Sequence, residues 1–293
     1  TRDLDKVKPA FQDLLDRMRT DYIDLGMIHF VDEAAEFQSI INGEFMEYVR
    51  GLKEQGIIRH IGMSTHNPAV AKMGALCGEI EMILFSINPA FDMLPASENI
   101  ADYFKERSEE ELGGIAPERA ELYRICEQEE VGITVMKGYA GGRLFSAEAS
   151  PFGVALTPVQ CLHYALTRPA VASVMVGYDT PDHVAAAVAY ESASEEEKDY
   201  ATVLAGAPHH AYAGQCTYCG HCAPCPAAID IAMVNKLYDL AVMQNEVPAS
   251  LRAHYDGLSA GAADCIGCGS CETRCPFGVH VVERMGQAKA LFS

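Results

Sequence analysis

The sequence has no apolar run of the ~18 residues that a membrane-spanning helix needs. Its first residues, TRDLDKVKPAF, lack the apolar stretch of a secretory signal and do not begin with Met. Basic residues are scarce, since 22 Lys and Arg stand against 41 Asp and Glu, for a formal net charge of −19. Such a polyanion repels phosphate backbones and anionic lipid. We therefore predict a cytoplasmic protein that binds neither nucleic acid nor membranes, and the missing Met leaves open that it belongs to a longer polypeptide.

Two cofactor motifs are also missing. No GxGxxG follows an apolar run, which argues against an open dinucleotide-binding sheet, and no flavin motif is present. Hydrophobic residues nevertheless make up 49% of the 293 residues. That share and length allow one large domain and a second, smaller one.

Up to about residue 190 the sequence alternates amphipathic stretches of helical period with apolar runs. The apolar runs, which we predict to be strands, are YIDLGMIHF, IIRHIGMST, MILFSINPAF, GITVMKGYA and VASVMVGY. Each has about the length of a strand that is buried on both faces. Strict alternation of helix and strand predicts a parallel α/β sheet. Five strands fit either an open doubly wound sheet or the later part of a (β/α)8 barrel.

Eight of the 11 cysteines lie in two short runs near the C-terminus. CTYCGHCAPCP has the spacing C-x2-C-x2-C-x2-C-P, and CIGCGSCETRCP has C-x2-C-x2-C-x3-C-P. Three-residue steps let a tight turn present thiolates to separate corners of one iron–sulfur cube. The alternative is a pair of zinc ribbons, which use separated pairs of cysteines and need no third cysteine in step. The spacing favours two [4Fe-4S] clusters.

The cysteine runs resemble those of two-cluster ferredoxins, in which the fourth cysteine of a run binds the other cluster. That resemblance implies two sets of ligands, namely Cys216, Cys219, Cys222 with Cys275, and Cys265, Cys268, Cys271 with Cys225. The first run is one residue shorter before its last cysteine. The three cysteines outside the runs are expected to be small core residues. We divide the chain into an α/β part (1–192), a linker (193–212) and a mostly helical two-cluster domain (213–293).

Several segments resemble the aldo-keto reductase family, in the same order along the chain. DYIDLGMIHF is similar to that family's tDYiDLyllH, GMSTHN to a strand end with a Ser-Asn pair, and VMKGYAGGRL to vMepLrGGkL. VGYDTPDHV resembles the cofactor-binding last strand and helix. A subgroup of the family carries a C-terminal two-cluster ferredoxin domain, and the resemblance to it covers essentially the whole chain. It implies about the last five βα units of a (β/α)8 barrel, with its chemistry at the C-terminal strand ends.

Family members reduce carbonyls with NAD(P)H, using a Tyr acid assisted by Lys, Asp and His. The resemblance assigns the His to His29, which would hold and polarise the substrate carbonyl. The Tyr, Asp and Lys belong to strands that would precede Thr1. The resemblance implies cofactor contacts at Ser64, Thr65, Asn88, Gly141, Gly142 and Gly177.

Three further residues belong to the same segments. His66 is expected to line the substrate pocket, and Lys137 either pairs with a phosphate or is solvated. Asp179 stands where the family often places a basic side chain against the 2′-phosphate of NADP. An acid there favours NADH, or a dinucleotide site that has been lost.

Two functions therefore compete. One is an iron–sulfur oxidoreductase that couples carbonyl and NAD(P)H chemistry to electron transfer through two [4Fe-4S] clusters, with a small carbonyl or quinone-like substrate and a redox partner protein. The other is an electron-transfer protein, or a redox sensor, whose barrel is a non-catalytic scaffold. The oxidoreductase hypothesis has one chemical difficulty: a nicotinamide transfers two electrons at once as a hydride, whereas each cluster passes one electron at a time. The strand-end residues His29, Ser64 and Asn88 favour the enzyme.

Overall fold

The centre of the molecule is a parallel sheet of five strands. The computed structural model describes residues 1–93, 114–207, 212, 214–242 and 246–293. The strands are β1 Ile23–Ile28, β2 Ile58–Thr65, β3 Met82–Ser86, β4 Gly132–Met136 and β5 Val171–Val174. Each falls within one of the five predicted apolar runs. The predicted parallel α/β fold is confirmed.

Neighbours in the sheet are also neighbours along the chain, in the order β1-β2-β3-β4-β5. A doubly wound sheet reverses its strand order at a switch point, and this sheet has no reversal. Because all the strands run parallel, their carboxyl ends lie along one edge. The polar residues that follow the strands are thereby brought to the same side of the molecule.

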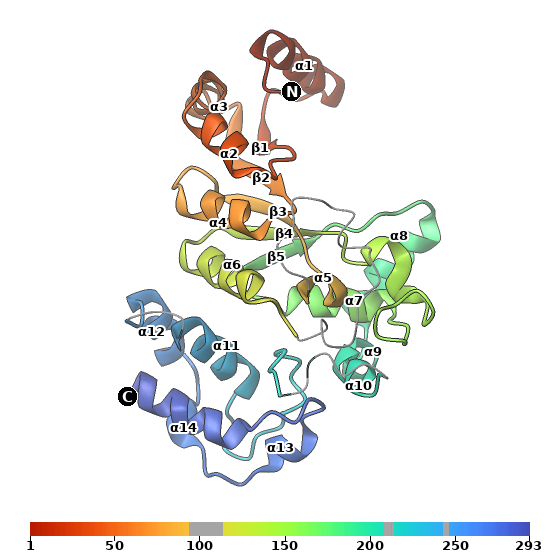
Figure 1. Cartoon of the computed structure of the whole chain (residues 1–293), viewed down its shortest axis with the longest axis vertical. Coiled ribbons are helices and arrows are strands. Elements are labelled where there is room, and N and C mark those ends of the chain that lie inside the picture. The colour runs from red at the N-terminus through yellow and green to blue at the C-terminus, as the bar shows by residue number, and fades with distance from the viewer. Residues whose placement is uncertain (94–113, 208–211, 213, 243–245) are drawn as a thin grey trace.

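Helices connect the strands (Figure 1). They are α1 Leu4–Met18, α2 Ala34–Ile41, α3 Glu44–Glu54, α4 Pro68–Leu76, α5 Pro89–Asp92, α6 Pro117–Gln128, α7 Pro158–Leu166 and α8 Pro181–Val188, with 3-10 turns η3 Ala140–Phe145 and η4 Ala189–Ser192. The sequence marks where several of them begin. Asn67, Thr157 and Thr180 cap α4, α7 and α8, each with proline at the first helical position. No helix in the described residues has the length and hydrophobicity needed to cross a membrane.

The core is densest in the middle strands. Ile83, Phe85, Ile133 and Val135 of β3 and β4 are fully buried, as predicted for strands covered on both faces. The edge strands differ: Leu25 of β1 is 44% exposed, and exposed positions also occur in β5. The prediction of burial on both faces was therefore wrong for β1 and β5, because several of their side chains are not covered by packed elements.

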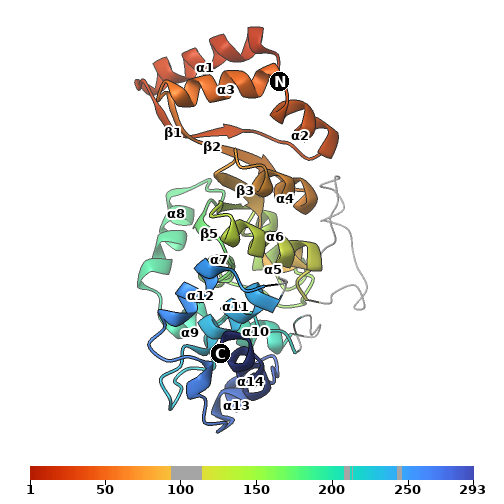
Figure 2. The ribbon, with the colours of Figure 1, turned by 90° about the vertical axis from the view of Figure 1, so that its left-hand side faces the viewer.

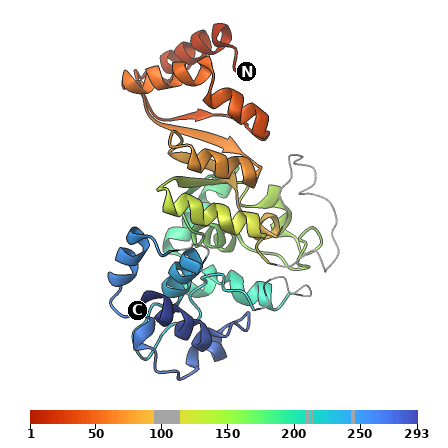
Figure 3. The ribbon, with the colours of Figure 1, turned by 60° about the vertical axis from the view of Figure 1, so that its left-hand side comes forward.

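The last part of the described chain is helical. It contains α9 Glu195–Lys198, α10 Tyr200–Ala205, α11 Ile231–Val242, α12 Ala249–Asp256, η5 Ala262–Asp264, α13 Ser270–Arg274 and α14 Val281–Phe292. Figures 2 and 3 show α11–α14 at the end of the molecule opposite to α1. Tyr200 and Leu204 of α10, within the predicted linker, are buried, and one continuous core extends from the strands to α14. The linker is thus a packed element over its described residues.

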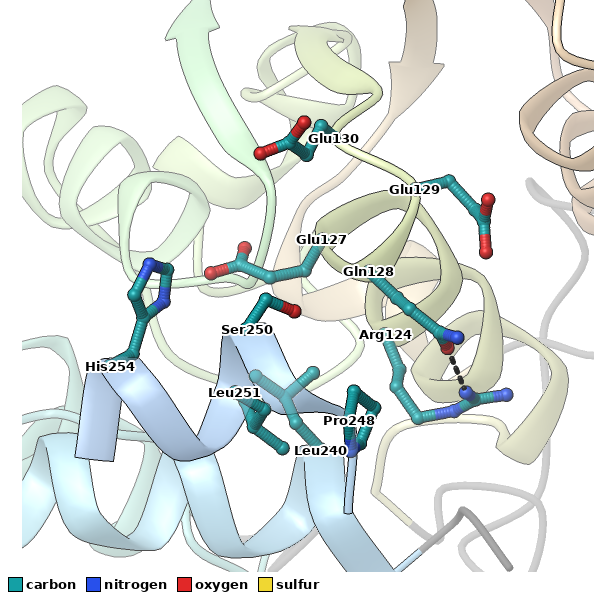
Figure 4. Close-up of a pocket in the computed structure, with 10 residues that line it drawn as sticks. All are labelled: Arg124, Glu127, Gln128, Glu129, Glu130, Leu240, Pro248, Ser250, Leu251 and His254. Carbon is teal, nitrogen blue, oxygen red and sulfur yellow. Dashed lines mark hydrogen bonds between the residues drawn. The ribbon is translucent and has the colours of Figure 1, made fainter. Parts of the chain in front are cut away.

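Side chains of α6 meet the C-terminal helices directly. Glu127 of α6 pairs with Lys236 of α11 at 3.7 Å and also accepts from the backbone N–H of Ala170. A hollow of about 430 Å³ separates α6 from α12 beside this contact (Figure 4). Arg124 donates to Gln128 at its rim over 3.1 Å. None of the predicted site residues is among the described residues that line it.

Glu81 joins three segments at the amino-terminal side of the sheet. Its carboxylate accepts from Lys53 and from the backbone N–H of Ile61, and it contacts His60 Nδ1 at 2.9 Å. Burial alone would raise the pKa of Glu81, but these bonds outweigh it and lower the pKa to about 2. A carboxylate whose pKa is lower in the folded chain stabilises the fold above its unfolded pKa, about 4.3.

We therefore expect the free energy of unfolding to fall as the pH drops from about 4.3 toward 2. Glu81→Gln should flatten this part of the profile, measured by urea unfolding over a pH series. Glu54→Gln, at an exposed position of α3, is the control and should leave the slope unchanged. If the free energy of unfolding of Glu81→Gln fell with pH in this range as steeply as that of the parent protein, the prediction would be contradicted.

Candidate functional site

The predicted catalytic and cofactor-binding residues lie at the carboxyl ends of the strands. His29 follows β1, Ser64 and Thr65 end β2, and Asn88 follows β3. His29 is exposed, and its carbonyl oxygen accepts from Arg2 Nη2 at 2.9 Å. The imidazole is therefore on the surface side of this edge, where a substrate can reach it.

Asp32, which was not singled out in the sequence, organises the same edge. Its carboxylate is 5% exposed and accepts from Thr65 Oγ1 at 2.9 Å and from the backbone N–H of His66 at 2.7 Å. It also faces His66 Nδ1 at 2.9 Å. Burial alone would raise the pKa of Asp32, but the bonds from His66 and Thr65 lower it. The site thus holds a buried carboxylate in its charged form.

His66 connects Asp32 to Lys137, which follows β4. Because Asp32 faces Nδ1 and favours a proton there, Nε2 is left to accept, and Lys137 Nζ lies 3.1 Å from it. Burial lowers the pKa of Lys137, and the nearby Asp32 acts in the opposite direction. The ends of β1, β2 and β4 are thereby joined through carboxylate, imidazole and amine.

Three of the predicted residues are engaged within the protein. Ser64 Oγ accepts from the backbone N–H of Phe30 at 2.7 Å, which ties β2 to β1. Asn88 is fully buried, donates to the carbonyl oxygen of Lys137 at 2.9 Å and caps α5. The Thr65 hydroxyl donates to the carboxylate of Asp32. These side chains shape the edge by holding neighbouring strand ends together.

A cavity of about 480 Å³ lies at the ends of β4 and β5. Its lining residues are Lys137, Gly138, Tyr139, Gly141, Gly142, Phe145, Pro158, Val176, Gly177, Asp179, His183 and Ala186. Gly141 and Gly142 have φ values of 67° and 84°, and open space lies where a Cβ would stand. A ligand can therefore approach bare backbone there. Gly141, Gly142 and Gly177, predicted separately, share this cavity with Lys137.

The two cysteine runs lie in the loops around α13 and before α11. None of their eight cysteines is in a disulfide. Gly220, Gly267 and Gly269 have φ between 66° and 84°, so the loops use conformations that favour glycine. Val279 also directs its backbone N–H at Cys275 Sγ, 3.4 Å away.

Thiols of the two runs act on one another. Burial raises the pKa of Cys219, Cys275 raises it further, and the backbone N–H of His221 opposes the shift. Burial also raises the pKa of Cys222 to about 12, with contributions from cysteines that include Cys271. Two cysteines of the second run therefore lie near the first.

These thiols and amide donors fit an iron–sulfur cluster, in which each thiolate binds a different iron and amides bond to sulfur. Among the residues that the structure describes, no three His, Cys, Asp or Glu side chains are grouped as a single metal ion would require.

Profiles of two known families match the chain. That of the aldo/keto reductase family matches residues 5–155, more than half of the sequence. The chain belongs to the aldo/keto reductase family. The 4Fe-4S dicluster domain matches residues 212–279, which include both cysteine runs. The predicted combination of an aldo/keto reductase chain with a C-terminal 4Fe-4S dicluster region is therefore confirmed.

Individual relatives of this aldo/keto reductase match parts of it. Methylglyoxal reductase DkgB of Salmonella typhi is 34% identical over 76 residues, which cover 24% of this chain and 27% of that protein. The same figures hold for methylglyoxal reductase DkgB of Escherichia coli O157:H7. The match thus spans about a quarter of these relatives' length. The holo form of aldo-keto reductase AKR11C1 from Bacillus halodurans aligns over 70% of this chain and 68% of its own, with 23% identity and a TM-score of 0.48.

Proposed function

We propose that this aldo/keto reductase is an iron–sulfur oxidoreductase whose nicotinamide and small carbonyl or quinone-like substrate bind at the carboxyl ends of the strands. Two [4Fe-4S] clusters would pass electrons to or from a redox partner protein. The observation that carries the proposal is the cavity at β4 and β5, where Gly141, Gly142, Gly177 and Lys137 converge. Relatives named as reductases of methylglyoxal, a small carbonyl compound, support the substrate class.

The residues of the cavity have complementary roles. Gly141 would offer its backbone N–H to the cofactor's phosphates, and the Lys137 ammonium would balance their charge. The N–H of Gly142 donates to the carbonyl oxygen of Tyr139 at 2.8 Å, so Gly142 would contribute only the open space of a residue without a side chain. His66 holds the Lys137 amine in place, and Asp32 holds the His66 ring. Asp179 on the cavity wall would repel a 2′-phosphate, which favours NADH.

His29, which follows β1 and does not line this cavity, would orient the substrate carbonyl from the same carboxyl-terminal edge of the sheet. A bound nicotinamide supplies hydride chemistry, two electrons at once. Clusters pass electrons singly, so we assign the exchange of single electrons to the partner protein. We place the protein in the cytoplasm, where its thiols stay reduced.

The sheet itself, we propose, is the later part of a (β/α)8 barrel, about the last five βα units. Its sequential strand order supports this, because barrel strands follow chain order. Leu25 and Met27 on β1 and Met175 beyond β5 are exposed apolar side chains at both edges of the sheet. Further strands paired with β1 and β5 would cover them. The barrel portion would comprise residues 1–192 and the cluster domain residues 213–293.

The clusters are assigned to crossed sets of cysteines. The first would be held by Cys216, Cys219, Cys222 and Cys275, and the second by Cys265, Cys268, Cys271 and Cys225. Arg274, the residue before Cys275, donates to the carbonyl oxygens of Cys222 and Pro224, and this contact between the two runs supports the crossing.

Binding of NADH, followed by calorimetry on the full protein, tests the function together with NADH-dependent reduction of simple aldehydes and quinones. Lys137→Ala should raise the Kd for NADH about tenfold or more, since a bond to a charged group contributes about 1.5–3 kcal/mol. Lys72→Ala is the control, because Lys72 pairs with Glu121 at 2.9 Å and does not line the cavity. Failure of the parent protein to bind nicotinamide at millimolar concentration would exclude the enzyme and leave the electron-transfer protein with a scaffold barrel.

A further inference from the structure

Arg168 is a buried cation next to the first cysteine run. It follows the last residues of α7, and its side chain is 1% exposed. The guanidinium stacks over the ring of Tyr164 at 4.5 Å on one side and lies 5.4 Å from the ring of Tyr218. Its Nη2 donates to the carbonyl oxygen of Thr217. Thr217 and Tyr218 stand between Cys216 and Cys219 in the sequence, so the guanidinium touches the loop that carries these thiols.

The charge of Arg168 is met by neutral groups. Besides Thr217, Nη2 reaches the hydroxyls of Thr167 at 3.0 Å and Tyr200 at 3.3 Å. Nε and Nη1 are buried and have no hydrogen-bond partner in the described part of the chain. The carboxylate of Asp92, which lies in the same buried region, receives the hydroxyls of Tyr123 and Tyr164 and lies 3.6 Å from Arg119 Nη1.

A buried cation without a close counter-charge is unfavourable, and the effective penalty is several kcal/mol per ion. Arg284, the other arginine near Cys216, does not share this condition, because Asp239 lies 2.6 Å from its Nη2. Asp92 also interacts electrostatically with Arg168, but the same carboxylate lies beside Arg119, so one carboxylate faces two buried guanidinium groups and one positive charge stays unbalanced among these three side chains. A cube bound by four thiolates is an anion and would balance that charge.

We propose that Arg168 is the counter-charge of the first cluster and sets its reduction potential. Reduction adds one electron to the cube and leaves its bonds to sulfur intact. A fixed cation stabilises the more negative, reduced cluster more than the oxidised one, and so raises the potential. In the described part of the chain, the contacts of Arg168 include residues of the first run and none of the second, so the charge would act more strongly on the first cluster, set the two potentials apart and give electron transfer between them a preferred direction. This inference rests on the proposed binding of clusters to the two cysteine runs.

The test is a redox titration of the anaerobically prepared full chain with dithionite, in which both clusters are followed by electron paramagnetic resonance. Arg168→Gln should make one of the two potentials more negative and leave the other in place. We expect at least a tenfold change in the ratio of reduced to oxidised cluster at a fixed potential, which is about 59 mV for a one-electron couple. Arg168→Lys keeps the charge and should stay closer to the parent than Arg168→Gln.

Two control variants separate the effect of the Arg168 charge from that of losing a hydrogen bond to the same loop or an arginine elsewhere in the domain. Tyr200→Phe removes a second bond to the Thr217 carbonyl, of 2.8 Å, without changing any charge. Arg252→Gln removes another partly buried arginine, which donates to the carbonyl oxygens of Leu291 and Phe292. Neither variant should shift a potential as Arg168→Gln does.

Unchanged potentials in Arg168→Gln, an equal shift of both, or an equal shift in Tyr200→Phe would overturn the inference. Should Arg168→Gln fail to retain two clusters, Arg168→Lys decides: retention of both supports the role of the charge, and loss of a cluster refutes it. Iron and sulfide analysis of the parent protein comes first. A parent without clusters refutes the proposed function as well, whereas a loaded parent with an unresponsive Arg168 variant refutes this inference alone.

Discussion

Cys275→Ala is expected to lose or convert one of the two clusters and to leave the other intact. Cys275 belongs to the second run in sequence, yet Arg274 beside it donates to the carbonyl oxygens of Cys222 and Pro224 in the first. Replacing it would remove the fourth thiolate of the first cluster while the other set keeps all its ligands. The parent should contain about eight irons and eight sulfides per chain, and the variant about four to seven of each. Iron and sulfide analysis with electron paramagnetic resonance measures the change.

Cys77→Ala is the matched control, since Cys77 is a partly buried cysteine outside the runs whose thiol donates to the carbonyl oxygen of Gly74. It should keep the full iron content. A Cys275→Ala protein with eight irons and unchanged spectra would show that Cys275 is not a ligand. Two zinc ions and no sulfide in the parent would overturn the whole assignment of ligands.

Asp92→Ala is expected to lower the free energy of unfolding by about 3–5 kcal/mol. Asp92 is fully buried, and its two oxygens accept from Tyr123 and, at 2.7 Å, from Tyr164. Arg119 Nη1 lies 3.6 Å from the same carboxylate. Alanine would leave two buried hydroxyls without their acceptor and remove a negative charge beside a buried guanidinium. Urea unfolding measures the loss.

Asp92→Asn retains one oxygen acceptor at nearly the same volume and should cost less than Asp92→Ala. The surface substitution Asp256→Ala serves as a second control and should stay within about 0.5 kcal/mol of the parent. A loss below about 1 kcal/mol in Asp92→Ala would mean that the tyrosine hydroxyls find other partners. The same network reaches the end of β3, because Tyr212 donates to the carbonyl oxygen of Pro89 at 2.7 Å and meets the Tyr164 hydroxyl at 3.1 Å.

Sequence alone determined most of the elements of this protein. The five strands followed from apolar runs of strand length and most of the helices between them from their 3.6-residue period, because both signals arise between residues close along the chain. Helix α2 was not predicted, and α5 begins within a run that was predicted to be a strand. The cysteine spacing also predicted a two-cluster region, since the directions in which one short loop presents its thiolates depend on local geometry. Gly141, Gly142 and Gly177 came instead from the resemblance of two segments to those of the aldo-keto reductases.

The tertiary structure alone decided which of these residues meet. Asp32 and His66 are 34 residues apart and His66 and Lys137 are 71 apart, so their contacts depend on the order and register of three strands. The tertiary structure also decided that Thr65 and Asn88 make hydrogen bonds within the protein, to Asp32 and to the carbonyl oxygen of Lys137. Nothing near Arg168 in the sequence predicts its burial. That burial results from packing α7 against a cysteine loop 49 residues away, a contact that no local pattern encodes.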